Sequence, residues 1–155
     1  MPLTLSASIK TRIESGGLGL QAFRDVLPEG NAANAAPKPP YCIIHEGIAV
    51  TPTGDNPYDK SYVAAKIEMV QIDLVQDWFD PVLKNADPPQ SKLKEDPTLT
   101  NGLIALLDGC VLSPFGTNNT RVWGCKVFGK AMRLFDRDAN QVRDSITLMI
   151  ERDTV

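Results

Sequence analysis

Two short segments carry apolar residues at helical spacing. Near the N-terminus these residues recur at i, i+4 and i+8, as Leu5, Ile9 and Ile13. This stripe predicts a helix that Thr4 or Ser6 can cap. The helix runs to about Glu14, and Gly16-Gly17 stops it.

A second stripe lies in the C-terminal half of the chain. It consists of Leu99, Leu103, Leu106 and Leu107. Thr98 or Thr100 can cap the helix that it predicts, and Gly109 lies near the end of that helix. The segment Leu18–Val26 fits either a short helix or an extended connection, and its pattern does not decide between them.

Four other segments have the pattern of strands: Tyr41–Val50, Ser61–Gln76, Val122–Val127 and Ser145–Glu151. In the second of them Val70, Ile72 and Leu74 alternate with Gln71 and Asp73. Such alternation is typical of an antiparallel strand with one buried face. The polar segment Asp136–Asn140 joins the last two strands as a turn.

Proline, glycine and Asx residues predict long loops at about 27–40, 51–61 and 77–97. Loops of this length are uncommon in compact domains unless they serve a function. The order of elements, αββαββ, predicts one α+β domain over residues 1–155. We expect an antiparallel sheet of about four strands, with two helices packed on one face.

The composition is that of an ordinary soluble globular domain. The chain has 155 residues, 43% of them hydrophobic, and a net charge of -3. A net negative charge argues against nucleic-acid binding. No apolar run approaches the ~20 residues that cross a bilayer, and the N-terminus lacks the features of a signal peptide. We therefore expect neither a nucleic-acid nor a membrane partner, and assembly in a cytoplasm.

The three cysteines, Cys42, Cys110 and Cys125, are odd in number and widely spaced. This spacing is neither a disulfide framework nor a zinc signature. Because each lies among apolar residues, we expect buried free thiols in a reducing compartment.

Candidate chemical groups are few, and each has a structural interpretation. His45 is the only histidine, and a strand-end residue with a satisfied hydrogen bond accounts for it better than a general base does. Asp73, Asp77 and Asp80 fit solvated acids better than a catalytic pair. The sequence therefore predicts no catalytic residue, no cofactor and no metal site, and it predicts that the protein is not an enzyme.

The Asp136–Asn140 segment also begins like a calcium loop, with Asp136, Asp138 and Asn140. Gln141 stands where that loop needs glycine, and Thr147 stands where it needs a bidentate glutamate. A turn is therefore the favoured interpretation.

Four segments together resemble one protein family: Tyr41–Gly47, Met69–Gln76, Leu99–Gly109 and Asp136–Arg152. In length, element order and segment character they resemble the tail terminator, or tail completion, proteins of long-tailed bacteriophages. The resemblance implies a virion protein that forms a ring, usually a hexamer, on the tail tube. It implies three partners: further copies of the chain, the major tail tube protein and the head–tail connector protein. The ring would end tube polymerisation and present the head-joining surface.

Two loops are the expected contact segments for such a ring, Gly54–Lys60 and Asp77–Glu95. An exposed strand edge or long loop can accept a neighbour, although such loops can also be tolerated surface insertions. Trp78-Phe79 is either a core plug or an interface anchor. The candidate interface residues are Gly54, Asp55, Asn56, Tyr58, Lys60, Asp77, Trp78, Phe79, Lys84, Lys92 and Lys94.

Two other functions remain open on the sequence. One is a head–tail connector or neck subunit, for which a small α+β ring subunit also serves. The other is a small ligand-binding or enzymatic α+β domain, for which His45, Glu46 and Asp73 form the polar cluster to test.

Overall fold

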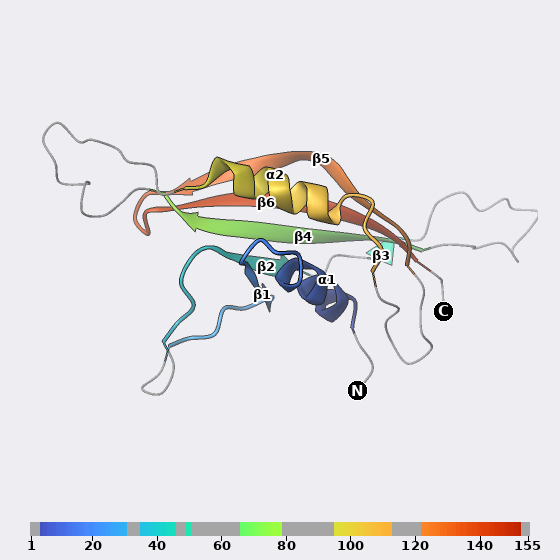
Figure 1. The fold of residues 1–155 in the computed structure, drawn as a ribbon, viewed down its shortest axis with the longest axis horizontal. Helices are drawn as coiled ribbons and strands as arrows, with labels where there is room; N and C mark the ends of the chain where they lie inside the picture. Colours follow the sequence, from blue (N-terminus) through green and yellow to red (C-terminus); the bar gives the residue numbers. More distant parts are fainter. Residues whose placement is uncertain are drawn as a thin grey trace, which may run out of the picture.

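A mixed β-sheet organises the fold (Figure 1). The computed structural model describes residues 4–30, 35–45, 49–50, 66–78, 95–112 and 122–152. In chain order the elements are α1 (Leu5–Glu14), β1 (Gln21–Arg24), β2 (Tyr41–His45), β3 (Ala49–Val50), β4 (Lys66–Asp77), α2 (Pro97–Leu107), β5 (Val122–Asp136) and β6 (Gln141–Arg152).

The expected sheet of about four antiparallel strands is wrong. Among the described residues six strands form one sheet in the order β1-β2-β4-β6-β5, with β3 also paired to β4. The β1–β2 pair is parallel, whereas the other pairs are antiparallel. The fold is still α+β, but it is richer in strand than expected.

Two local features account for the extra strands. β1 has four residues, too few for a periodic signal, and it lies inside the undecided segment Leu18–Val26. A hydrogen bond from α1 holds β1 in position, because the Glu14 carboxylate at the end of α1 accepts from the backbone N–H of Ala22 in β1 at 3.2 Å. The expected strand Tyr41–Val50 is instead two strands, since β2 ends at His45 and pairing with β4 resumes at Ala49.

The helices begin where side chains satisfy free backbone N–H groups. The Thr4 hydroxyl accepts from the Ala7 N–H at 3.1 Å, as expected for the first helix. In α2 the cap is Asp96, and neither of the predicted threonines takes that role. Its carboxylate accepts from the Thr98 backbone N–H at 2.9 Å, and Pro97 occupies the first helical turn, where it needs no N–H partner.

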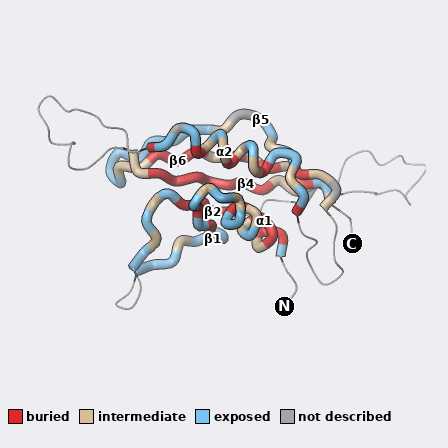
Figure 2. Tube along the Cα trace, in the orientation of Figure 1, coloured by how far each residue is buried: buried red, intermediate tan, exposed pale blue. Residues whose placement is uncertain are grey.

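One hydrophobic core joins both helices to one face of the sheet. The apolar stripes of α1 and α2 belong to the same buried cluster as Ile44, Ile72 and Ile146. Both helices lie over this face in Figure 1, and Figure 2 shows the buried residues concentrated along β4 and β6. We call the opposite side the helix-free face, because no described helix packs on it.

The two C-terminal strands are longer than expected, and they join directly through the predicted turn. The Asp136 carboxylate accepts from the Ala139 N–H at 3.1 Å, and Asn140 takes a φ of 54°, which asparagine tolerates well. The register between β5 and β6 shifts at Val122/Gly124 and again at Phe128/Met132. The first shift lies at Gly124 and the second spans Gly129, and glycine in a strand is typical of a bulge.

A buried leucine of α2 tests this core. Leu103 is 0% exposed, so Leu103→Ala should lower the free energy of unfolding by about 2–5 kcal/mol through lost burial and a residual cavity. The matched control is Val111→Ala, since Val111 is 87% exposed and its change should stay within about 0.5 kcal/mol. Urea unfolding followed by circular dichroism measures both. Equal losses in the two variants would contradict this packing.

Candidate protein interface

Large apolar side chains lie exposed along β5 at the edge of the sheet. On the helix-free face Phe128, Met132 and Leu134 are 57%, 64% and 51% exposed. They lie opposite Thr147, Ser145 and Arg143 of β6. The residues that alternate with these three along β6 point to the other face and are buried in the core. Three such residues on one edge strand form a candidate surface for protein contact. We call them the β5 apolar row.

The same strand meets Trp78 at its far end. The rings of Trp78 and Phe135 lie 4.7 Å apart between centroids at an interplanar angle of 40°, and Phe135 is 52% exposed. The Trp78 backbone N–H also donates to the Asn140 carbonyl at 2.9 Å, which ties the end of β4 to the hairpin turn. Trp78 therefore lies against β5, next to an exposed aromatic residue.

Of the predicted interface residues, two lie in the described part of the chain. Asp77 is the last residue of β4, opposite Gln141, and Trp78 follows it. The other nine lie outside the described residues: Gly54, Asp55, Asn56, Tyr58, Lys60, Phe79, Lys84, Lys92 and Lys94. The β5 apolar row was not predicted, because the expected strand ended at Val127, before Phe128, Met132 and Leu134.

A polar cluster occupies the centre of the helix-free face, around Asp73. Sequence alternation placed Asp73 on this face, but the expectation of a solvated acid is wrong, because its side chain is 3% exposed. Its carboxylate accepts from Ser145 Oγ at 2.6 Å and from Gln71 Nε2 at 2.9 Å. His45 Nε2 lies 3.1 Å away and Arg143 Nη1 lies 3.5 Å away. These partners compensate the burial of the charge.

Serine, histidine and aspartate meet here, but in the wrong order for nucleophilic catalysis. In a catalytic triad the serine hydroxyl donates to the histidine and the aspartate holds the far side of the imidazole. Here Ser145 donates to Asp73, and His45 bonds the same carboxylate. The Asp73 carboxylate is thus the common partner of both side chains, and in the described part of the chain the Ser145 hydroxyl donates to this carboxylate and not to the imidazole. As predicted, His45 ends its strand with a hydrogen bond.

A second polar cluster, built on two buried carboxylates, lies on the helix-covered face. Asp144 and Glu95 have side chains 3% and 6% exposed, and Arg133 bonds both of them. The contacts from Arg133 Nε and Nη2 to Asp144 are 2.8 and 3.1 Å. Thr100 Oγ1 donates to Asp144 at 2.5 Å. The hydrogen bond to Asp144 is the main cause that raises the pKa of the Arg133 guanidinium.

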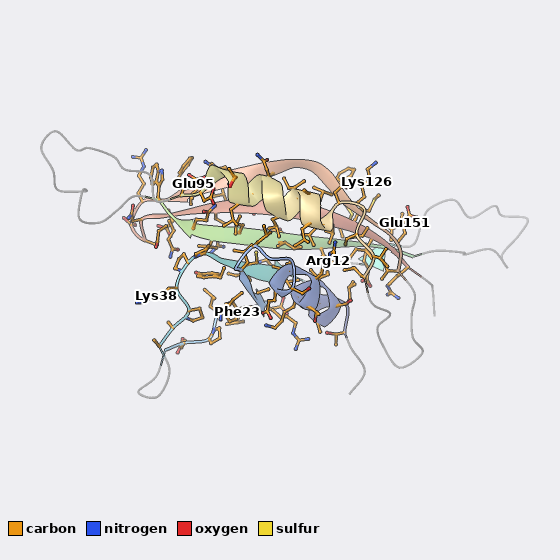
Figure 3. All side chains as sticks on the ribbon, in the orientation of Figure 1. Arg12, Phe23, Lys38, Glu95, Lys126 and Glu151 are labelled. Atoms are coloured by element: carbon orange, nitrogen blue, oxygen red, sulfur yellow. The ribbon has the colours of Figure 1, made fainter. Side chains whose placement is uncertain are left out.

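This arginine clamp, formed by Arg133, Glu95 and Asp144, joins three elements of the structure. It holds the start of α2, where Glu95 precedes the helix, against β5 and β6; Figure 3 shows Glu95 beside the first turn of α2. Asp144 interrupts an otherwise apolar register, Val142, Ile146, Leu148 and Ile150. A charge in a buried register was a signal available in the sequence.

Within the described residues, no group of three or more His, Cys, Asp or Glu side chains is placed to hold a metal ion. Neither helix in the described part of the chain combines the length and the apolar character needed to cross a membrane.

Comparison with known proteins bears on the fold. None of the protein-family models matches the chain, and no curated protein matches it significantly. Among solved structures, a chain of the virion of a native gene transfer agent particle is similar over 96% of this chain and 94% of that chain. The two chains share a fold. The TM-score is 0.57 at 16% sequence identity, which is too low an identity to carry residue roles across.

Replacing Arg133 should show how much free energy is lost when the two buried carboxylates of the arginine clamp have no cation beside them. Arg133→Ala leaves Asp144 and Glu95 without their cation, and a broken buried ion pair costs about 3–5 kcal/mol. Because Arg133 is itself 40% exposed, we expect a smaller loss of roughly 2–3 kcal/mol in unfolding free energy. Arg137→Ala, at an exposed turn position, is the matched control for charge. If the two variants unfold alike in urea, the clamp contributes nothing to stability.

Proposed function

We propose that this protein is a structural subunit of a phage-like virion and that it acts by binding other proteins. The observation that carries the proposal is the similarity, over nearly the full length of both chains, to a chain of a gene transfer agent virion. The carboxylate-centred arrangement around Asp73 fits a structural role better than catalysis. The proposed location is the virion, after assembly in the host cytoplasm.

Within the virion, the proposed role is tail terminator. The segments that resemble this family run from β2 to β6 and span most of the chain. The mechanism is steric: a ring of subunits, six in the proposed form, sits on the tip of the tail tube. It covers the surface on which the next tube subunit would dock, and its other side offers the joining surface for the head connector. No turnover and no cofactor are involved.

The sheet supplies two different edges for ring closure. β1 lies at one end of the strand order and β5 at the other. A closed ring needs a heterologous contact, in which one patch of a subunit meets a different patch of the next. We assign the β5 apolar row to this subunit contact, because desolvated aromatic and aliphatic anchors dominate interface energies.

The two loops remain the proposed contacts with the tube and with neighbouring subunits. They lie at 51–61 and 77–97, and both connect directly to β4 or β3. Asp77 and Trp78 mark where the second loop leaves the sheet. The alternative role, a head–tail connector or neck subunit, uses the same ring and differs in which partner the ring touches.

The molecular mass of the chain in solution and its effect on tail-tube growth together test the tail-terminator role. The purified chain is examined by light scattering across a wide concentration range, with negative-stain images of the largest species. It is then added to the major tail tube protein of its own particle during polymerisation. We expect closed rings of about six copies, alone or on tube tips, and shorter tubes as the chain is added. A chain that never closes into rings and leaves tube length unchanged would contradict a tail terminator. Rings that bind connector but ignore tubes would support the neck role.

Charge substitutions in the β5 apolar row test the subunit contact. Phe128→Asp or Leu134→Asp places a carboxylate at a half-exposed position, so the monomer should stay folded while association weakens by roughly tenfold or more. Val111→Asp is the matched control, since Val111 is 87% exposed and lies away from the row. Light scattering measures the ring, and circular dichroism checks the fold. Rings of normal stability in both row variants would refute this assignment.

Deleting a loop distinguishes the contribution of the loops to assembly from that of the β5 apolar row. Replacing Gly54–Lys60 with a short glycine linker should leave the unfolding midpoint nearly unchanged, because surface loops contribute little to the core. We expect the shortened chain to lose ring formation or tube capping. Normal rings and normal capping would reduce this loop to a tolerated insertion.

A further inference from the structure

Two cysteines from distant chain positions lie side by side beneath the end of α2. The Gly109 backbone N–H donates to the Cys125 carbonyl at 2.7 Å, which brings the segment after α2 against β5. The thiols of Cys110 and Cys125 hydrogen-bond one another. Both residues line a cavity of about 440 Å³, together with Val122, Lys126, Met149 and Glu151. The cavity gives a small reagent access to the pair.

The two thiols are chemically unequal. The hydrogen bond from Cys125, with help from the Arg12 guanidinium, outweighs burial and lowers the pKa of Cys110 to about 7. The same hydrogen bond and burial raise the pKa of Cys125, which keeps its proton. The lowered pKa favours the thiolate of Cys110, the nucleophilic form, beside a thiol that can resolve an oxidised product.

Arg12 is held in place by contacts that do not involve the cysteines. Its Nε and Nη2 atoms donate to the Leu106 carbonyl at 3.4 and 3.3 Å. That carbonyl belongs to the last turn of α2, one turn before Cys110. Figure 3 shows Arg12 on α1 on the side toward the end of α2. A cation fixed there favours an anion at Cys110.

We propose that Cys110 and Cys125 form a peroxide-sensitive dithiol that closes to a disulfide. The Cys110 thiolate attacks one oxygen of a hydroperoxide, the O–O bond breaks, and hydroxide or alkoxide leaves, so that Cys110 becomes a sulfenic acid. The Cys125 sulfur then attacks the sulfenic sulfur, the S–O bond breaks, and the Cys125 proton passes to the departing hydroxide to give water as the S–S bond forms. The two sulfurs lose two electrons in all, and the peroxide accepts them.

Cys42 serves as an internal reference for this chemistry. It is 0% exposed in the core, and burial raises the pKa of its thiol to about 12. It lies on β2, outside the residues that line the cavity. The proposed disulfide would tie the end of α2 to β5 covalently, and it is independent of the proposed virion role.

Trypsin separates the three cysteines and so gives a direct test. Cys110 falls in peptide 95–121, Cys125 in 122–126 and Cys42 in 25–60. The folded full chain is treated with hydrogen peroxide, blocked with iodoacetamide and digested without reductant. We expect peptides 95–121 and 122–126 to appear linked, lighter than their sum by two hydrogen atoms, with Cys42 left reduced. Free Cys110 and Cys125, or links that involve Cys42, would overturn the proposal.

Variants separate the roles of the two thiols. Cys125→Ser removes the resolving thiol but keeps a hydroxyl that can donate a hydrogen bond to Cys110, so Cys110 should stop at a sulfenic acid that dimedone captures. Cys42→Ser should form the linked peptides as the wild-type chain does. In the wild type, iodoacetamide should label Cys110 at a rate that rises through a midpoint near pH 7, well below the midpoint of an ordinary thiol. A Cys110 labelling midpoint at the ordinary value, or no dimedone adduct in Cys125→Ser, would show that Cys110 is not activated.

Discussion

The long antiparallel pairing of β4 with β6 is the constraint on which the rest of the structure depends. All twelve residues of β4 pair with β6 in one unbroken register, from Lys66 opposite Arg152 to Asp77 opposite Gln141. Because side chains alternate between the faces of a strand, this register decides which residues meet the helices. It also places Asp73 beside Ser145 on the helix-free face. A slip of one residue would exchange the apolar core for that polar cluster.

Much of this frame could be predicted from the sequence where the pattern is strong. The alternation of Val70, Ile72 and Leu74, the stripes of both helices and the Asp136–Asn140 turn each depend on neighbouring residues. The four-residue β1 could not be predicted in this way, because its position comes from Glu14 and from β2. The sequence analysis placed the cap at Thr98 or Thr100 because threonine also caps helices, although aspartate is the stronger N-cap residue.

The candidate sites depend even more on tertiary structure. The sequence marks Trp78 as either a core plug or an interface anchor, but it gives no sign of Phe135, the ring that Trp78 contacts from far along the chain. Cys110 and Cys125 looked unrelated because their spacing matches no motif, and only the approach of the α2 end to β5 brings them together. The arginine clamp likewise draws on three separate segments. A single-sequence pattern carries local preference, whereas these sites depend on which strands become neighbours.

The strand order has a consequence for how the protein is made. β6 is the last of the described strands along the chain, yet it lies between β4 and β5 in the middle of the sheet. During synthesis on the ribosome, β4 therefore leaves the exit tunnel before β6 has been made, and the edge of β4 that pairs with β6 stays unpaired during that time. The sheet therefore cannot be completed until β6 has emerged, and until then the unpaired edge of β4 is open to edge-to-edge association with other chains.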